Sequence, residues 1–201
     1  MSDDAIVPVP VVQAGALVLR APAAPVPHEI IATPEFQELV ATMIATMRAA
    51  PGVGLAAPQI GVPWRLFVLE DRDELISTLT AAERRERGRL PFDIRVLVNP
   101  VVRPVGEERA TFFEGCLSVD GYAALVERSH EVEVAGLDEH GEPSAFRAQG
   151  WPARILQHEI DHLDGILYID RMFTRSFCTI EHVKTLYGGK SIEEVRRMLG
   201  V

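Results

Sequence analysis

Residues 151–165, WPARILQHEIDHLDG, decide the fold and point to the chemistry of this chain. They predict a helix from Trp151 to Leu163, with Gly165 placed to end it. His158 and His162 are four residues apart, so they share one helix face and can converge on one metal ion. Glu159 can then reach a water molecule at that ion as a general base. The stretch therefore predicts a metal-dependent hydrolytic centre.

A site of this type needs a third protein ligand and an open fourth position for water. Tyr168 stands where a metzincin-type site would have its third histidine, so that extension fails. Glu181 is at about the spacing of a thermolysin-like site and would give a zinc endopeptidase with His158 and His162. Cys116 follows an apolar segment and can present a thiolate. A cysteine hydrolase with Cys116 as nucleophile would leave the second histidine without a role.

Length and composition exclude other function classes. The chain has 201 residues, of which 47% are hydrophobic and 24% are charged, as in an ordinary globular domain. A net charge of −9 argues against DNA and general RNA binding. No stretch approaches the run of about 20 apolar residues that a membrane helix needs, so we expect no membrane partner. The two cysteines favour a reducing compartment, and the first residues lack the pattern of a secretory signal.

The pattern along the chain predicts one α+β domain over residues 1–201. Residues 1–14 are expected to be a flexible N-terminal arm, because prolines recur through the first 27 residues and forbid a long helix there. A helix should begin at Thr33 and Pro34 and end at Pro51 and Gly52. Strands are predicted at 64–69, 94–98, 110–113, 126–134, 143–148 and 166–169, with a hairpin turn at 138–141.

Strands that cluster between helices favour antiparallel or mixed sheets, packed around the helix that carries the two histidines. Residues 191–194, Ser-Ile-Glu-Glu, form a capping-box pattern and predict a short C-terminal helix. Residues 71–91 are highly charged, so we expect them to be a solvated surface insertion, with room for a short helix.

Three segments, in this order, resemble the signature motifs of peptide deformylases: GVGLAAPQIG at 52–61, EGCLS at 114–118 and QHEIDHL at 157–163. The resemblance spans about residues 15–172. It implies removal of the formyl group from N-formylmethionine at the start of new polypeptides, with release of formate. It further implies nascent chains as substrate. We expect action in the bacterial cytoplasm, or in an organelle if a transit peptide has been removed. Arg196 and Arg197 offer a local basic patch for a transient ribosome contact.

The resemblance also implies roles for individual residues. The metal ligands would be Cys116, His158 and His162, and Glu159 would act as general base, then acid, for a metal-bound hydroxide that attacks the formyl carbon. The oxyanion would be stabilised by Gln59 and by the backbone N–H of Leu117. The substrate cleft would be lined by Val53, Gly54 and Gly115, and we expect Ile155 in the pocket for the methionine side chain.

The metal is a separate question from its ligands. Two imidazoles and one thiolate accept Zn²⁺ readily, and also Fe²⁺, Co²⁺ or Ni²⁺, so the ligand types alone favour zinc. The resemblance instead implies Fe²⁺ as the physiological ion, with Zn²⁺ usually a poorer catalyst.

The sequence departs from many bacterial deformylases after the cysteine. Tyr122 and Ala123 stand in the region where those relatives carry an arginine, which leaves recognition of the peptide backbone or carboxylate open. Arg128 could compensate in part, although a surface charge is the favoured interpretation. Gln157 suits a helix-surface amide and support of the ligands equally well. Cys178 matches no signature and is expected to be a structural or surface thiol.

Overall fold

Strand β2 (Leu66–Asp71) lies in the interior of the fold, and both of its faces are buried. In the computed structural model, which describes residues 6–50 and 52–201, Leu66 and Val68 pack against helix α2 (Pro34–Ala49). Phe67 and Leu69 point the other way, toward helix α5 (Trp151–Leu163). Successive side chains of a strand alternate between faces, so a strand buried on both sides is apolar throughout.

The main sheet pairs its strands in the order β1-β2-β3-β4-β5, and every pairing between them is antiparallel. The other strands are β1 (Gly54–Ala56), β3 (Phe92–Cys116), β4 (Val119–Leu137), β5 (Pro143–Gln149) and β6 (Cys178–Thr179), which pairs with β4. The predicted strands 94–98 and 110–113 are parts of β3, because bulges let it bend instead of ending. The predicted hairpin joins β4 to β5.

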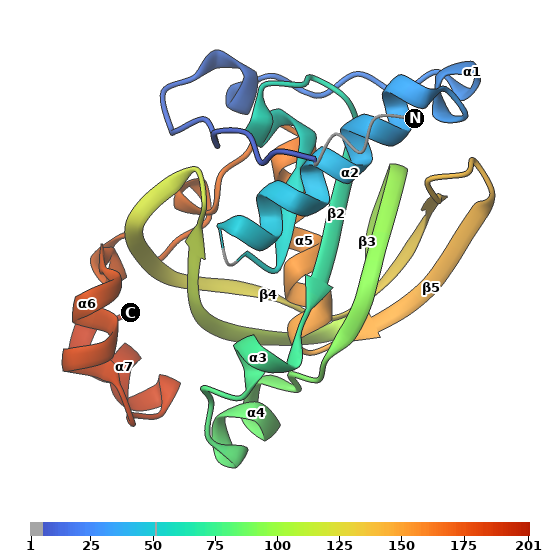
Figure 1. Cartoon of the computed structure of the whole chain (residues 1–201). Helices are drawn as coiled ribbons and strands as arrows, with labels where there is room; N and C mark the ends of the chain where they lie inside the picture. The colour runs from blue at the N-terminus through green and yellow to red at the C-terminus, as the bar shows by residue number, and fades with distance from the viewer. Residues whose placement is uncertain (1–5, 51) are drawn as a thin grey trace.

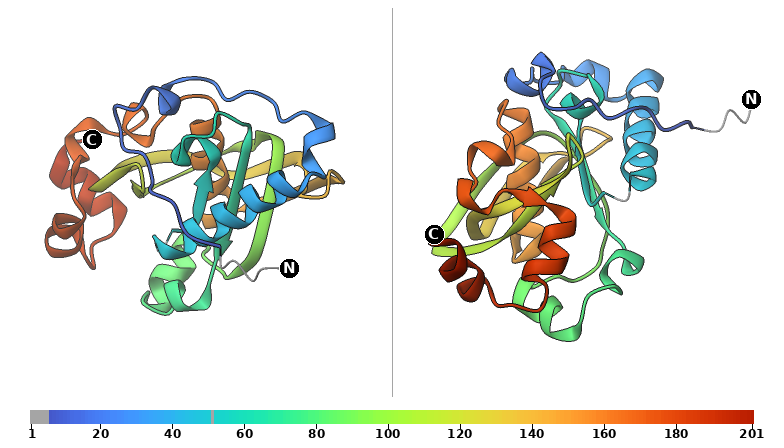
Figure 2. Two further views of the ribbon diagram at one scale, coloured as in Figure 1. Left: turned by 45° about the horizontal axis from the view of Figure 1, so that its top comes forward. Right: turned by 90° about the vertical axis from the view of Figure 1, so that its left-hand side faces the viewer.

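Helix α5 lies against strands β1 to β5, inside the curve of the sheet, and α2 lies outside it (Figures 1 and 2). Thr33 caps α2 as predicted, since its hydroxyl accepts a hydrogen bond from the Phe36 N–H at 3.3 Å. The predicted helix end at Pro51 lies outside the described residues. An antiparallel sheet around a central helix confirms the α+β prediction.

Shorter helices lie at the edges of the fold. A strand predicted at 166–169 is wrong: Tyr168–Asp170 form a 3-10 helix, because the Asp170 carboxylate accepts a hydrogen bond from the Leu167 N–H at 2.8 Å. The predicted C-terminal helix is α7 (Ile192–Leu199), capped by Ser191. No helix in the described ranges is long and apolar enough to cross a membrane. The remaining helices are α1 (His28–Ile31), α3 (Asp73–Ile76), α4 (Ala81–Arg87), α6 (Ile180–His182) and α7 (Ile192–Leu199), with 3-10 turns at Leu17–Arg20, Ala57–Ile60 and Thr174–Ser176 and a π turn at Val183–Tyr187.

The N-terminal segment from residue 6 onward runs along the body of the molecule (Figure 2). The Val9 N–H donates to the Thr46 hydroxyl of α2 at 3.0 Å. Further along, Ala24 forms an isolated parallel bridge with Trp64. The segment is thus held by main-chain hydrogen bonds at several points, and residues 1–5 lie outside the described part of the chain.

Candidate active site

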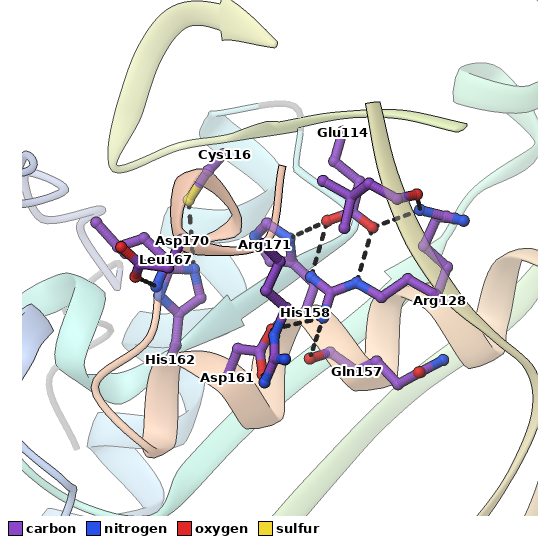
Figure 3. A network of polar contacts seen from close by, with 12 residues as sticks. Glu114, Cys116, Arg128, Gln157, His158, Asp161, His162, Leu167, Asp170 and Arg171 are labelled. Atoms are coloured by element: carbon purple, nitrogen blue, oxygen red, sulfur yellow. Dashed lines mark hydrogen bonds and ion pairs between the residues drawn. The ribbon is translucent and has the colours of Figure 1, made fainter. Parts of the chain in front are cut away.

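Three side chains of types that can bind a metal ion converge where β3 ends against α5. The ligand atoms of Cys116, His158 and His162 all lie within 4.8 Å of one another, and Cys116 Sγ is 3.3 Å from His162 Nε2 (Figure 3). The histidines come from successive turns of α5, and the cysteine is the last residue of β3. One thiolate and two imidazoles suit a borderline-soft divalent cation, so these residues fit a metal ion.

Glu181, the alternative third ligand, lies elsewhere. It is exposed on the short helix α6 and does not belong to this ligand group. The zinc endopeptidase interpretation, which needs Glu181 at the metal, is therefore not favoured by the arrangement of the described residues.

Glu114 orients the first histidine. Its Oε2 lies 3.1 Å from His158 Nδ1, which leaves Nε2 of the imidazole for an ion (Figure 3). Arg128 donates to both oxygens of the Glu114 carboxylate, at 3.0 and 2.9 Å. Arg154 donates to the same group at 2.6 Å. Burial alone would raise the pKa of Glu114, but the charge of Arg128 and the hydrogen bond of His158 hold it far below its ordinary value.

The ion-pair network continues to Asp161, another residue of α5. Asp161 accepts from Arg128 Nη1 at 2.5 Å and from Arg171 Nε at 2.7 Å (Figure 3). The favoured interpretation of Arg128 as a surface charge is therefore wrong: its side chain is 4% exposed, because β3 and α5 supply two carboxylates that neutralise it. Glu114 and Arg154 were not singled out from the sequence. Arg154, four residues before His158 on the same helix face, is the signal that could have revealed this network.

Glu159 is buried beside the ligands. Burial raises the pKa of its carboxyl, and the charge of the nearby His158 lowers it. The effect of burial is the larger, so the pKa is about 7. The pKa of His162 is held well below its ordinary value by burial, which keeps its imidazole neutral and able to bind a metal.

The side chain of Gln59 is already oriented. Its Oε1 accepts a hydrogen bond from the Ala56 N–H at 2.8 Å. Its Nε2 therefore faces the ligand group, 3.3 Å from Ser118 Oγ and 3.6 Å from Cys116 Sγ. A donor amide thus stands at the metal-ligand end of the cleft.

A cleft of about 380 Å³ opens at this point. It is lined by nine of the ten residues that the sequence placed in the site, namely Val53, Gly54, Gln59, Gly115, Cys116, Leu117, Ile155, His158 and Glu159. The tenth, His162, is 1% exposed and does not line the cleft. The segments that carry these residues are distant in sequence, and α5 brings them together.

Trp151 and Ile180 also line the cleft and were not anticipated. Guanidinium groups of Arg87 and Arg89 lie 5.3 and 5.2 Å from the centroid of the Trp151 ring. Arg89 in turn is paired with the buried carboxylate of Asp71 at 2.7 Å. The charged segment 71–91 therefore backs one wall of the cleft.

The C-terminal segment forms another part of the rim. Tyr122, in the region without the arginine, stacks on Phe177 with ring centroids 5.0 Å apart. Ala123 pairs with Cys178, which is half-buried in β6 and lies outside the ligand group. Strand β6 thus occupies the space beside this part of β4 and brings Ile180 to the cleft.

Gln157 supports the sheet and not the ligands. Its Oε1 accepts from the Ser129 N–H at 3.0 Å, and its Nε2 donates to the Ser129 carbonyl at 2.8 Å. The side chain thus substitutes for a neighbouring strand at this point of β4, which neither sequence interpretation anticipated.

The family model for polypeptide deformylases matches residues 8–176. This chain belongs to the polypeptide deformylase family. It is 50% identical over 173 residues to peptide deformylase 1A of tomato chloroplasts (Solanum lycopersicum), a match over 86% of this chain. Peptide deformylase 1 of Streptomyces coelicolor is 46% identical over 193 residues, covering 96% of this chain and 86% of that protein.

Among solved structures, the class I type b deformylase of Acinetobacter baumannii with bound Met-Ala-Ser is similar, with a TM-score of 0.74 and 34% identity. The match covers 83% of this chain and 99% of that one. The chain spans only 62% of the length of the tomato relative.

Proposed function

We propose that this deformylase-family chain removes the formyl group from N-formylmethionine at the start of newly made polypeptides and releases formate. The observation that carries the proposal is one cleft that joins the Cys116, His158 and His162 group to the buried carboxylate of Glu159. Three protein ligands leave a fourth position open, as in catalytic and not structural sites. The Acinetobacter relative that holds Met-Ala-Ser supports a peptide substrate.

Glu159 carries the proton transfers in this proposal. With a pKa of about 7, its carboxyl can accept and return a proton near neutral pH. A divalent ion on Cys116, His158 and His162 would act as a Lewis acid and lower the pKa of a bound water molecule. Glu159 takes a proton as water attacks the formyl carbon, and it delivers this proton to the methionine nitrogen as the C–N bond breaks. The products are formate and the free amine.

Two neutral donors serve the formyl oxygen as it gains negative charge. Gln59 Nε2 is already turned toward the ligand group because Ala56 holds the other end of the amide. The Leu117 N–H follows directly after Cys116 at the cleft wall. Donors that need no rearrangement favour the transition state over the ground state.

A peptide in the cleft would lie beside the terminal strand of the sheet. Strand β1 is at one end of the strand order, and Val53 and Gly54 border the cleft. An extended peptide can therefore add to this edge through main-chain hydrogen bonds. Ile155 and Trp151 line the same cleft and offer apolar surface to the methionine side chain.

We propose Fe²⁺ as the physiological ion, with Zn²⁺, Ni²⁺ or Co²⁺ as replacements in purified protein. The ligand set accepts all four, and Zn²⁺ generally binds such sites more tightly than Fe²⁺, so supply would decide occupancy. The orientation of His158 by Glu114 suits any of these ions.

The deciding experiment is formate release from formyl-Met-Ala-Ser by protein purified without oxygen and loaded with Fe²⁺. Glu159→Gln should lower kcat by about 10²- to 10⁴-fold with metal still bound. Glu181→Gln, a matched change outside the site, should leave kcat unchanged. Metal-loaded wild-type protein that releases no formate would contradict the proposal, and a loss of bound metal in the Glu181 variant would revive the endopeptidase alternative.

The methionine pocket has its own test. An apolar pocket recognises side chains by size, so formyl-Met peptides should exceed formyl-Ala peptides in kcat/KM by a factor worth about 1–3 kcal/mol. Equal values of kcat/KM for the two peptides would remove Ile155 and Trp151 from substrate recognition.

We further propose action on nascent chains in the bacterial cytoplasm, supported by the Streptomyces match over 96% of this chain against 86% for the tomato relative. A transient ribosome contact would involve Arg197 more than Arg196. Arg197 is exposed, whereas Arg196 stacks on Phe173 at 5.2 Å and donates to the Val201 carbonyl. Sedimentation with ribosomes that weakens in Arg197→Ala but not in Arg196→Ala is the expected result.

A further inference from the structure

We propose that the N-terminal arm positions the two oxyanion donors from outside the cleft, and that Gln13 is the positioning residue for the turn that carries Leu117. The inference rests on the proposed function, because the Leu117 N–H and the Gln59 amide are oxyanion donors only if the chain removes formyl groups by that mechanism. Neither composition nor any signature motif draws attention to Gln13, which is exposed on the arm.

Gln13 forms hydrogen bonds to both ends of the turn between β3 and β4. Its Nε2 donates to the Leu117 carbonyl at 2.9 Å, and its Oε1 accepts from the Asp120 N–H at 3.3 Å. The same Nε2 lies 3.3 Å from the Val11 carbonyl, which braces the side chain against its own backbone. One amide thus closes the turn as a neighbouring strand would.

The residues on either side of Gln13 bind two segments of the site: the segment that carries Gln59 and the turn that carries Leu117. The Val12 N–H donates to the Gln59 carbonyl at 2.8 Å, and the Ala14 N–H donates to the Ser118 carbonyl at 2.8 Å. Inside the cleft the segments meet through side chains, where Gln59 Nε2 lies 3.3 Å from Ser118 Oγ. Three consecutive arm residues therefore fix the spacing between the segments that carry the two donors.

The arm adds to a restraint that the sheet supplies only in part. The last pair of the β3–β4 ladder, Cys116 with Val119, follows a register shift at Gly115, and Leu117 and Ser118 form the turn beyond it without ladder partners of their own. A donor contributes to catalysis through its fixed position relative to the developing oxyanion. Loosening the turn should therefore weaken transition-state binding, which lowers kcat, with little effect on substrate binding.

The test is Gln13→Ala compared with Gln37→Ala in the Fe²⁺-loaded enzyme. Gln37 is a matched control, because its Nε2 donates to the Ile31 and Glu139 carbonyls at 2.9 and 2.7 Å, away from the cleft. Loss of the Gln13 hydrogen bonds should lower kcat about 3- to 10-fold, with KM within about twofold and metal content unchanged. Gln37→Ala should leave kcat unchanged.

A second readout does not depend on activity. In metal-free protein, amide hydrogen exchange of residues 117–120 should be faster in Gln13→Ala than in the wild type, and unchanged in Gln37→Ala. An unchanged kcat, a selective rise in KM, or a fall in kcat that follows loss of metal would each overturn the proposal.

Gln59→Leu separates this failure from a failure of the proposed function. If Gln59→Leu loses activity and Gln13→Ala keeps its full kcat, the arm has no positioning role and the oxyanion assignment stands. If Gln59→Leu keeps its full kcat, the oxyanion assignment itself fails, and the positioning proposal fails with it.

Discussion

Gly54 and Glu159 are packed so closely that a Cβ atom at position 54 would lie 2.7 Å from Glu159 Cδ and 3.0 Å from its Cγ. Only glycine lets β1 come this near to α5. The sequence placed Gly54 in the substrate cleft, and the packing adds that its missing side chain makes room for the carboxylate.

Gly54→Ala should therefore displace the Glu159 carboxylate. Because the proposed proton transfer depends on the position of this group, kcat should fall by about 10²-fold while the bound metal remains. Steady-state formate release with metal analysis of the same sample measures both quantities. Gly106→Ala is the control: nothing lies within 4 Å of its added Cβ, although its φ of +66° strains an alanine, so only stability should fall. Full activity in Gly54→Ala would show that Glu159 can move without cost.

The buried carboxyl of Glu159 should make metal-free protein less stable at high pH. Its folded pKa of about 7 lies above the ordinary 4.5, so the folded state binds more protons than the unfolded state between these values. The free energy of unfolding should therefore fall as pH rises through this window, by about 3 kcal/mol in total. Glu159→Gln should remove this dependence and be the more stable protein at pH 8.

Urea unfolding of both proteins with a chelator, at pH 4.5 and at pH 8, tests this. The two proteins should be similar in stability at the lower pH and should separate at the higher. If the two proteins differ in stability by the same amount at both pH values, burial does not raise the pKa of the Glu159 carboxyl.

Local sequence signals were sufficient for the elements that depend on neighbours along the chain. The four-residue spacing of His158 and His162 predicts one ligand face on α5, and Thr33 with Pro34 predicts the start of α2. Both features need only helix geometry. The resemblance to deformylase motifs then brought Cys116 and Gln59 to the same site, which spacing along the chain alone could not do.

The buried ion pairs could not be predicted in this way. Glu114 and Arg128 meet because of the register between β3 and β4, and register is set by the whole pairing and its bulges. An isolated Arg128 in the sequence therefore looks like a surface charge. The strand predicted at 166–169 failed for a related reason, since a side chain of Asp170 decides that backbone.

Gln157 provides a test of a structural role beside the first histidine. Its amide pairs with both the N–H and the carbonyl of Ser129, which is 2% exposed. Gln157→Met keeps the volume and leaves these buried groups without partners, so the free energy of unfolding should fall by about 1–3 kcal/mol. The kcat of the folded enzyme should stay within about twofold, since the amide touches no metal ligand. A large fall in kcat would instead assign Gln157 to the support of His158.

Glu114 should matter for both stability and metal binding. Glu114→Gln keeps the shape but leaves the buried cations of Arg128 and Arg154 with less negative charge, which should cost about 3 kcal/mol of unfolding free energy. His158 also loses the carboxylate that orients it, so metal affinity should fall about 10- to 100-fold.

The matched control for this change is Glu133→Gln, which breaks an ion pair with Arg147 whose side chains are 51% and 62% exposed. Solvent screens that pair, so the change should be under about 1 kcal/mol. Urea unfolding and competition with a metal chelator measure the two effects. Equal, small losses of unfolding free energy in both variants would mean that water reaches the Glu114 network. The unpaired charges of Arg128 and Arg154 would then cost no more than an unpaired charge at the surface. Lower stability in Glu114→Gln with unchanged metal affinity would mean that α5 alone fixes the ring of His158, because the helix would then hold the imidazole without its carboxylate partner.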